Sequence, residues 1–230
     1  MKYIGKRNRK RDKNMDNIVI SNLNFQYEKD SRIFENASMD LKTGNIYLLT
    51  GENGSGKTTL MKLIAGLISG ADVERIRWKG KDVNSFLELK ERIVYVSETP
   101  YLYDYLTGRE NVDLIIDLFG ISDKRENVYA NIRDLNLSND MNKLVKDYSL
   151  GMRYKLFLSA ALLVDSDLVL MDEPFSSLDS EGQLVAQKMV DLYVKRGGIV
   201  IISTHIKGYI SKYNKCHYMV GDRGLKYEEH

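Results

Sequence analysis

Cysteine, proline and long apolar runs are scarce in this chain. Its 230 residues include one cysteine, Cys216, and two prolines, Pro100 and Pro174. A lone cysteine excludes an internal disulfide framework and is typical of proteins that fold in a reducing cytosol. No apolar run approaches the roughly 18 residues that a membrane-spanning helix requires. The basic N-terminus leads into no apolar segment of the kind found in secretory signals, so we expect no signal peptide.

Positive charge is concentrated at the N-terminus. Residues 1–13 hold seven basic side chains and one acidic side chain, whereas the remainder carries 27 basic and 31 acidic ones. We expect residues 1–15 to be a basic leader without fixed structure, or a cloning remnant. An anchor on an anionic membrane surface is the alternative, since each Lys or Arg contributes about 1 kcal/mol there. The mildly acidic remainder argues against a nucleic-acid partner.

One glycine-rich segment carries the strongest chemical signal. Residues 51–59 read GENGSGKTT, which has the G-x-x-x-x-G-K-[ST] spacing of a P-loop, between the strand-like run 46–49 and the helix-like run 60–64. The glycines allow backbone N–H groups to converge on an anion, and the helix N-terminus adds partial positive charge. This predicts a nucleoside triphosphate site. The expected contacts are Gly51, Asn53, Gly54, Ser55, Gly56, Lys57, Thr58 and Thr59, with Lys57 on the β- and γ-phosphates and Thr58 on Mg²⁺.

Two carboxylates follow a second apolar run. Residues 168–171 read LVLM and precede Asp172 and Glu173. A buried parallel strand would place Asp172 beside the P-loop, where it would hold Mg²⁺ together with Thr58, and Glu173 would polarise the attacking water. His205 follows another apolar run and would sense the γ-phosphate. The alternatives are two solvated acids at a strand end and a structural or exposed histidine.

Alternation of strand and helix patterns predicts an α/β fold. With so few prolines, the breaks between elements fall at glycines and polar turns. Strands are expected at 18–25, 34–41, 46–49, 73–78, 92–96, 168–171 and 198–203, a helical period from 99 to 163, and a helix at 181–195. We therefore predict a P-loop NTPase fold, with a mostly parallel core sheet, an N-terminal antiparallel β subdomain and an inserted α-helical subdomain (about 99–163), in one domain spanning 16–225.

Together with further motifs, these segments resemble the ATP-binding subunit of ABC (ATP-binding cassette) transporters over roughly residues 16–220. In chain order the motifs are the aromatic Tyr27, Glu98 at the Q-loop position, the signature Tyr148-Ser149-Leu150-Gly151-Met152, the Walker B pair Asp172-Glu173, the D-loop Ser176-Ser177-Leu178-Asp179, and the switch histidine His205. The resemblance implies ATP and Mg²⁺ as ligands. It implies that Tyr27 stacks on adenine, that Glu98 lies beside the metal as a ligand, and that Lys57, Glu173 and His205 are catalytic.

The resemblance also implies a dimer. In the family, ATP binds between two subunits arranged head to tail. Ser149 and Gly151 would then contact the γ-phosphate held by a partner, with Asp179 nearby. The partner would be a second copy of this chain or a different cassette subunit.

Two motifs depart from the family pattern. The signature has Leu150 and Met152 in place of a glycine and the glutamine, but it keeps the serine and glycine that contact phosphate. Glu98 replaces a glutamine, so a carboxylate adds negative charge and cannot donate a hydrogen bond. This combination looks like the ATPase subunits of bacterial lantibiotic-immunity and bacitracin-resistance exporters.

The expected function is therefore ATP hydrolysis that powers export, of peptide antimicrobials or drugs, through a separate membrane permease. The protein would be cytoplasmic and peripheral on the inner face of the cell membrane. Two alternatives are a soluble ABC-type ATPase acting on ribosomes or DNA, and a nucleotide-gated regulatory module that hydrolyses little or nothing.

Overall fold

The computed structural model describes residues 17–28, 32–204 and 216–229. The basic leader and His205, for which the sequence predicts roles, lie outside the described residues. Within the described part, no helix combines the length and the apolar character needed to cross a membrane.

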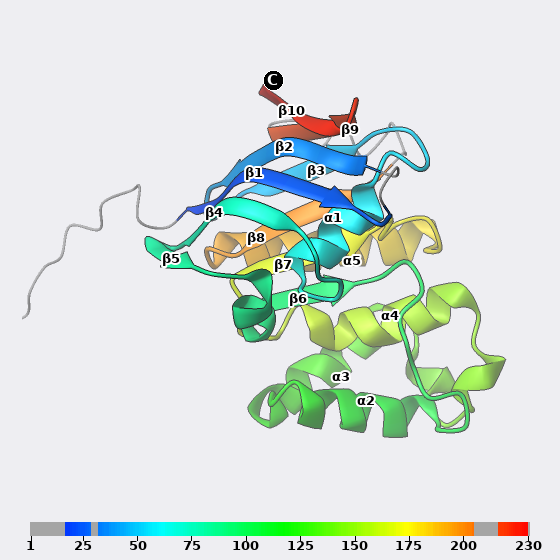
Figure 1. Ribbon diagram of the computed structural model, residues 1–230. Coiled ribbons are helices and arrows are strands. Elements are labelled where there is room, and N and C mark those ends of the chain that lie inside the picture. Colours follow the sequence, from blue (N-terminus) through cyan, green and yellow to red (C-terminus); the bar gives the residue numbers. More distant parts are fainter. Residues whose placement is uncertain (1–16, 29–31, 205–215, 230) are drawn as a thin grey trace, which may run out of the picture.

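A six-stranded sheet forms the centre of the molecule (Figure 1). Its strands are β3 (Ile46–Thr50), β6 (Ile93–Val96), β7 (Leu168–Asp172), β8 (Ile199–Ser203), β9 (Cys216–Gly221) and β10 (Gly224–Glu229), in the order β10-β9-β3-β8-β7-β6. All neighbours pair in parallel except the β9–β10 hairpin. Every residue of β7 and β8 is buried, as expected for central strands of a parallel sheet that is covered on both faces.

A second, antiparallel sheet covers one side of this core. It consists of β1 (Ile18–Gln26), β2 (Arg32–Leu41), β4 (Asp72–Trp78) and β5 (Lys81–Val83), in the order β2-β1-β4-β5. Helix α1 (Lys57–Ile64) lies between the two sheets (Figure 1). Its apolar side chains share one core cluster with inward-facing residues of both sheets, because β1 and β2 alternate between buried and exposed positions.

Helices cover the opposite face and one end. They are α2 (Gly108–Leu118), α3 (Arg125–Asp134), α4 (Leu150–Ala161) and α5 (Ser180–Lys195), with short 3₁₀ helices at Phe86–Arg92, Ser122–Lys124, Ser138–Asp140 and Val145–Asp147. Helices α4 and α5 pack on the parallel sheet, while α2 and α3 pack on the far side of α4 (Figure 1). Helix α4 is thus buried on two sides, which explains its largely apolar sequence LGMRYKLFLSAA.

The predicted fold class is confirmed, but some local predictions are wrong. The C-terminal hairpin β9–β10 was not predicted and runs beyond residue 225. The short strand β5, which forms by pairing with β4, was not predicted either. Residues 99–107 form no helix, although the helical period was expected to begin at 99.

A buried asparagine explains the extended course of that last segment. Asn111 in α2 is almost fully buried. Its Oδ1 accepts a hydrogen bond from the Tyr103 amide at 2.8 Å, and its Nδ2 donates to the Tyr103 carbonyl at 3.0 Å and the Thr107 carbonyl at 3.0 Å. The side chain therefore replaces the backbone partners that a helix would provide.

Replacing Asn111 with Ala should lower the free energy of unfolding by about 2 to 3 kcal/mol, because buried backbone groups lose their partners. Equilibrium urea denaturation measures this loss. The exposed Asn84→Ala variant is the control and should change stability by less than about 0.5 kcal/mol. Equal stability of the two variants would contradict the role given to Asn111.

Candidate nucleotide-binding site

The P-loop joins β3 to α1, and two of its glycines lie where no side chain fits. A Cβ on Gly51 would approach the Val220 carbonyl oxygen to 2.4 Å, and one on Gly56 would approach a methyl group of Ile33 to 2.8 Å. Both glycines have positive φ, at 145° and 108°. The hairpin and the antiparallel sheet therefore press against the loop from two sides and fix its curvature.

Lys57 is held inside this curve. Its side chain is only 9% exposed, and its ammonium donates hydrogen bonds to the carbonyls of Gly51 at 2.8 Å and Glu52 at 3.0 Å. The Ser55 hydroxyl oxygen in the same loop is buried and has no hydrogen-bond partner among the described residues. A buried polar atom of this kind calls for a partner, and a phosphate oxygen would supply one.

Asp172 ends β7 and is 5% exposed. Three hydroxyl groups donate to its carboxylate. Thr58 and Tyr95 donate to Oδ2 at 2.8 Å and 3.2 Å, and Ser203 donates to Oδ1 at 2.5 Å. The structure thus brings Thr58 and Asp172 together, as the sequence predicted for a shared magnesium site.

Two tyrosines near this carboxylate differ in their contacts. Burial and the charge of Asp172 raise the pKa of the Tyr95 hydroxyl well above its ordinary value, so it stays protonated and acts as a donor. Burial also raises the pKa of Tyr154, with a contribution from Asp172, but the Tyr154 hydroxyl has no hydrogen-bond partner within the described residues.

Glu173 follows Asp172 and has an unusual backbone conformation. Its φ of 47° falls in the left-handed region, which costs a non-glycine residue of the order of 1 kcal/mol or more. Its amide donates to the Ser203 hydroxyl at 3.0 Å. The same serine therefore fixes both members of the Asp172-Glu173 pair.

The cavity beside the P-loop has a volume of about 370 Å³. Its lining brings together most of the predicted contacts: Tyr27, Asn53, Gly54, Gly56, Lys57, Thr58, Thr59, Glu98, Asp172 and Glu173. The ring of Tyr27 is 58% exposed, and its hydroxyl lies 3.2 Å from the Thr59 hydroxyl. An exposed aromatic ring in the lining of the cavity suits stacking on a flat base.

The donor set fits a magnesium nucleotide. Hydroxyl and carboxylate oxygens are the ligands that Mg²⁺ prefers, and it usually keeps several waters and phosphate oxygens besides. Thr58 Oγ1 and Asp172 Oδ2 lie 2.8 Å apart, so one small ion can reach both. In the described ranges, no group of three or more His, Cys, Asp or Glu side chains is arranged to hold a metal ion.

Five predicted contacts do not line this cavity. Gly51 and Ser55 line a second cavity on the hairpin side of the P-loop, and the other three, Ser149, Gly151 and Asp179, belong to the signature and the D-loop. Ser149 caps α4 and accepts a hydrogen bond from the Met152 amide at 3.2 Å. A Cβ on Gly151 would approach the Ser177 carbonyl oxygen to 2.4 Å, so the signature packs on the D-loop. Asp179 caps α5. The Gly182 amide and the Lys155 ammonium both bind its carboxylate and lower its pKa.

Some residues of the site escape sequence reasoning. Ser203 and Tyr95 hold Asp172, and Lys155 joins the signature helix to the D-loop. The sequence marks Tyr95 and Ser203 by position alone, because Tyr95 lies three residues before Glu98 and Ser203 lies two residues before His205. Nothing in the sequence marks Lys155.

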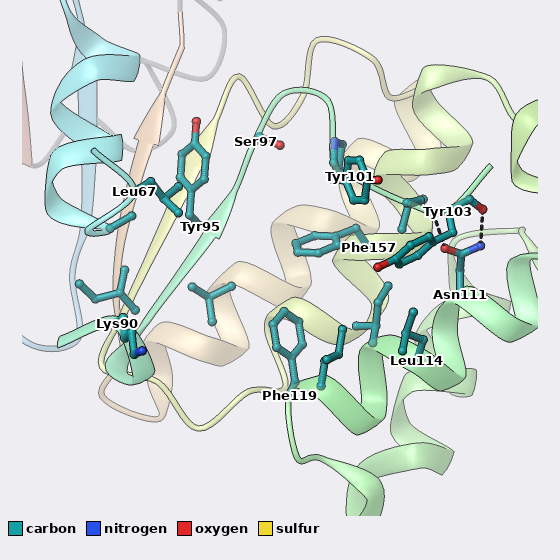
Figure 2. Close-up of a pocket in the computed structure, with 17 residues that line it drawn as sticks. Leu67, Lys90, Tyr95, Ser97, Tyr101, Tyr103, Asn111, Leu114, Phe119 and Phe157 are labelled. Carbon is teal, nitrogen blue, oxygen red and sulfur yellow. Dashed lines mark hydrogen bonds between the residues drawn. The ribbon is translucent and has the colours of Figure 1, made fainter. Parts of the chain in front are cut away.

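A separate apolar groove of about 570 Å³ lies between the parallel sheet and the helices (Figure 2). Leu67, Tyr95, Tyr101, Leu114, Phe119 and Phe157 are among its lining residues. Tyr101 is highly exposed at the rim, and Figure 2 shows Tyr95 at the sheet side of the groove.

Comparison with known proteins identifies a matching family and similar proteins. A family model described as ABC transporter matches residues 34–176. An uncharacterized ABC transporter ATP-binding protein of Bacillus subtilis, YcbN, is 32% identical over 199 residues, which cover 86% of this chain and 64% of YcbN. The lantibiotic transport ATP-binding protein SrtF of Streptococcus pyogenes is 29% identical over 193 residues, covering 82% of this chain and 80% of SrtF.

A solved structure shares the fold. The structure of an ATP-binding subunit of an ABC transporter has a TM-score of 0.81 and 23% sequence identity, covering 92% of this chain and 89% of the other. The family match, the relatives and the fold agree with the site described above. This chain belongs to the ABC transporter family as an ATP-binding protein.

Proposed function

We propose that this chain hydrolyses ATP with Mg²⁺ and that hydrolysis powers export through a separate membrane permease. The observation that carries the proposal is the single cavity lined by Lys57, Thr58, Asp172 and Glu173. A phosphate-binding cation, two oxygen ligands for a metal and a candidate base are the parts that phosphoryl transfer to water requires.

Each side chain has a distinct task in this reaction. Lys57 exchanges its two loop carbonyls for phosphate oxygens and neutralises part of their charge. Thr58 and Asp172 would hold Mg²⁺, which would supply charge neutralisation on the phosphates. Glu173 orients a water and accepts its proton while the water oxygen bonds to the γ-phosphorus and the bond to the β-phosphate oxygen breaks, giving ADP and inorganic phosphate. His205 is proposed to contact the γ-phosphate.

A second subunit would complete the site. Ser149 and Gly151 do not line the P-loop cavity of their own chain. A head-to-tail dimer, of two copies or of this chain with another cassette subunit, would bring a partner's signature onto the bound ATP. In each subunit the cap of α4 holds the side chain of Ser149 in place.

The apolar groove is the proposed contact for the permease. An apolar lining with exposed tyrosines at its rim suits an amphipathic segment of a partner protein (Figure 2). The protein would then be held at the inner face of the cell membrane. The likeness to SrtF, which is named for lantibiotic transport, favours a peptide antimicrobial as the exported substrate.

A regulatory module that binds ATP without turnover is the second candidate. The observation that favours it is Glu98, whose carboxylate lines the cavity together with those of Asp172 and Glu173. Three carboxylates around one phosphate site would slow a reaction in which negative charge accumulates.

Replacing Glu173 with Gln should decide between these candidates. Hydrolysis should fall at least about 100-fold because the base is lost, whereas ATP binding should persist and an ATP-bound dimer should accumulate. Phosphate release and size-exclusion chromatography measure the two effects. The exposed Glu91→Gln variant is the control and should match wild type. Wild-type protein that binds ATP without measurable turnover would favour the regulatory module.

Replacing Lys57 with Ala should weaken ATP binding about 100-fold, because the phosphates lose their buried charge partner. Titration with a fluorescent ATP analogue measures the dissociation constant. Lys188→Ala removes an exposed lysine from α5 and should leave affinity unchanged. Affinity of wild-type strength in the Lys57 variant would contradict the assignment of the P-loop.

A further inference from the structure

Tyr95 belongs to two sites at once. Its side chain lines the apolar groove, as does Leu67, and Figure 2 shows its hydroxyl directed away from Phe119. The same hydroxyl donates to Asp172 Oδ2 at 3.2 Å. One rigid side chain therefore runs from the wall of the groove to the carboxylate that also accepts from Thr58.

The sheet fixes this placement. Strand β6 is the edge strand of the parallel sheet and pairs with β7, with Tyr95 opposite Leu170 and Val96 opposite Met171. Asp172 follows Met171, so the tyrosine lies two positions short of the carboxylate on the adjacent strand. A tyrosine hydroxyl extends far enough to bridge that offset, and the half-buried ring keeps one side in contact with the groove.

Tyr154 provides a natural contrast. Its hydroxyl is fully buried and close enough for Asp172 to influence it, but it has no hydrogen-bond partner in the described part of the chain. Of these two tyrosines, Tyr95 is the one that orients the carboxylate.

We propose that Tyr95 is a positioning residue that couples occupancy of the apolar groove to the magnesium-binding carboxylate of Asp172. The inference rests on the proposed Mg²⁺-dependent ATPase. A partner segment that shifts the ring of Tyr95 changes the hydrogen bond to Asp172 and thereby the affinity for the metal. Because coupling between two sites is reciprocal, metal binding at the nucleotide changes the groove in return.

The first test is Tyr95→Phe, which removes the hydroxyl and keeps the ring. Mn²⁺ is titrated into protein loaded with the non-hydrolysable β,γ-imido analogue of ATP and followed by electron paramagnetic resonance. The Mn²⁺ dissociation constant should rise about tenfold, the lower end of the range for a residue that orients a metal ligand. Affinity for the analogue without metal should match wild type, which a general loss of structure would not allow.

Tyr154→Phe is the matched control. It removes a buried hydroxyl near the same carboxylate but no hydrogen bond, so the Mn²⁺ dissociation constant should equal that of wild type. Equal Mn²⁺ affinity in wild type and Tyr95→Phe would overturn the inference while leaving the proposed ATPase standing. Wild-type protein that binds neither analogue nor metal would overturn the proposed function and the inference with it.

The second test measures how the groove responds to metal. Hydrogen exchange of amides in residues 97–103 is followed in analogue-loaded protein with and without Mg²⁺. Metal should change the exchange of this segment in wild type and in Tyr154→Phe, and the response should be at least halved in Tyr95→Phe. An equal response in all three proteins, or none in wild type, would overturn the coupling.

Discussion

The candidate site depends on the hydrogen bonds that the buried carboxylate of Asp172 accepts. The carboxylate receives hydroxyl groups from three separate elements, Thr58 of α1, Tyr95 of β6 and Ser203 of β8. These donors converge because β7 lies between β6 and β8, and because the end of β7 lies beside the first turn of α1. The strand order therefore determines which hydroxyl groups reach the carboxylate. A register slip of one residue in β7 would turn the carboxylate to the other face of the sheet.

The P-loop has the same dependence on distant parts of the chain. Gly51 packs against the carbonyl of Val220 in the hairpin, and Gly56 packs against side chains of β2. The glycines thus allow the hairpin and the antiparallel sheet to pack against the loop that is proposed to hold the nucleotide. A substitution at either position would have to move backbone or core side chains before it reached any ligand.

Sequence reasoning located the parts of the site that are set by short spacing. The P-loop and the Asp172-Glu173 pair were found because a strand, a turn and a helix impose their geometry within a few residues. Tyr95 and Lys155 were missed because each acts on a partner that only the tertiary fold brings near. Strand β10 was missed because its polar sequence GLKYEE shows no strand pattern. It forms a strand by pairing with β9.

The signature lies at the capped N-terminus of α4 and contains two kinds of position, those that are fixed by contacts with the backbone and those that are not. Ser149 and Gly151 are fixed by backbone contacts, the first by its cap and the second by the Ser177 carbonyl. Met152 packs against the core of the helices, and Leu150 is 40% exposed. The departures from the family pattern therefore fall where the backbone imposes no constraint. A search that demands the usual letters at those two positions would overlook such a cassette, whereas one that demands a capping serine and a glycine against the D-loop would recover it.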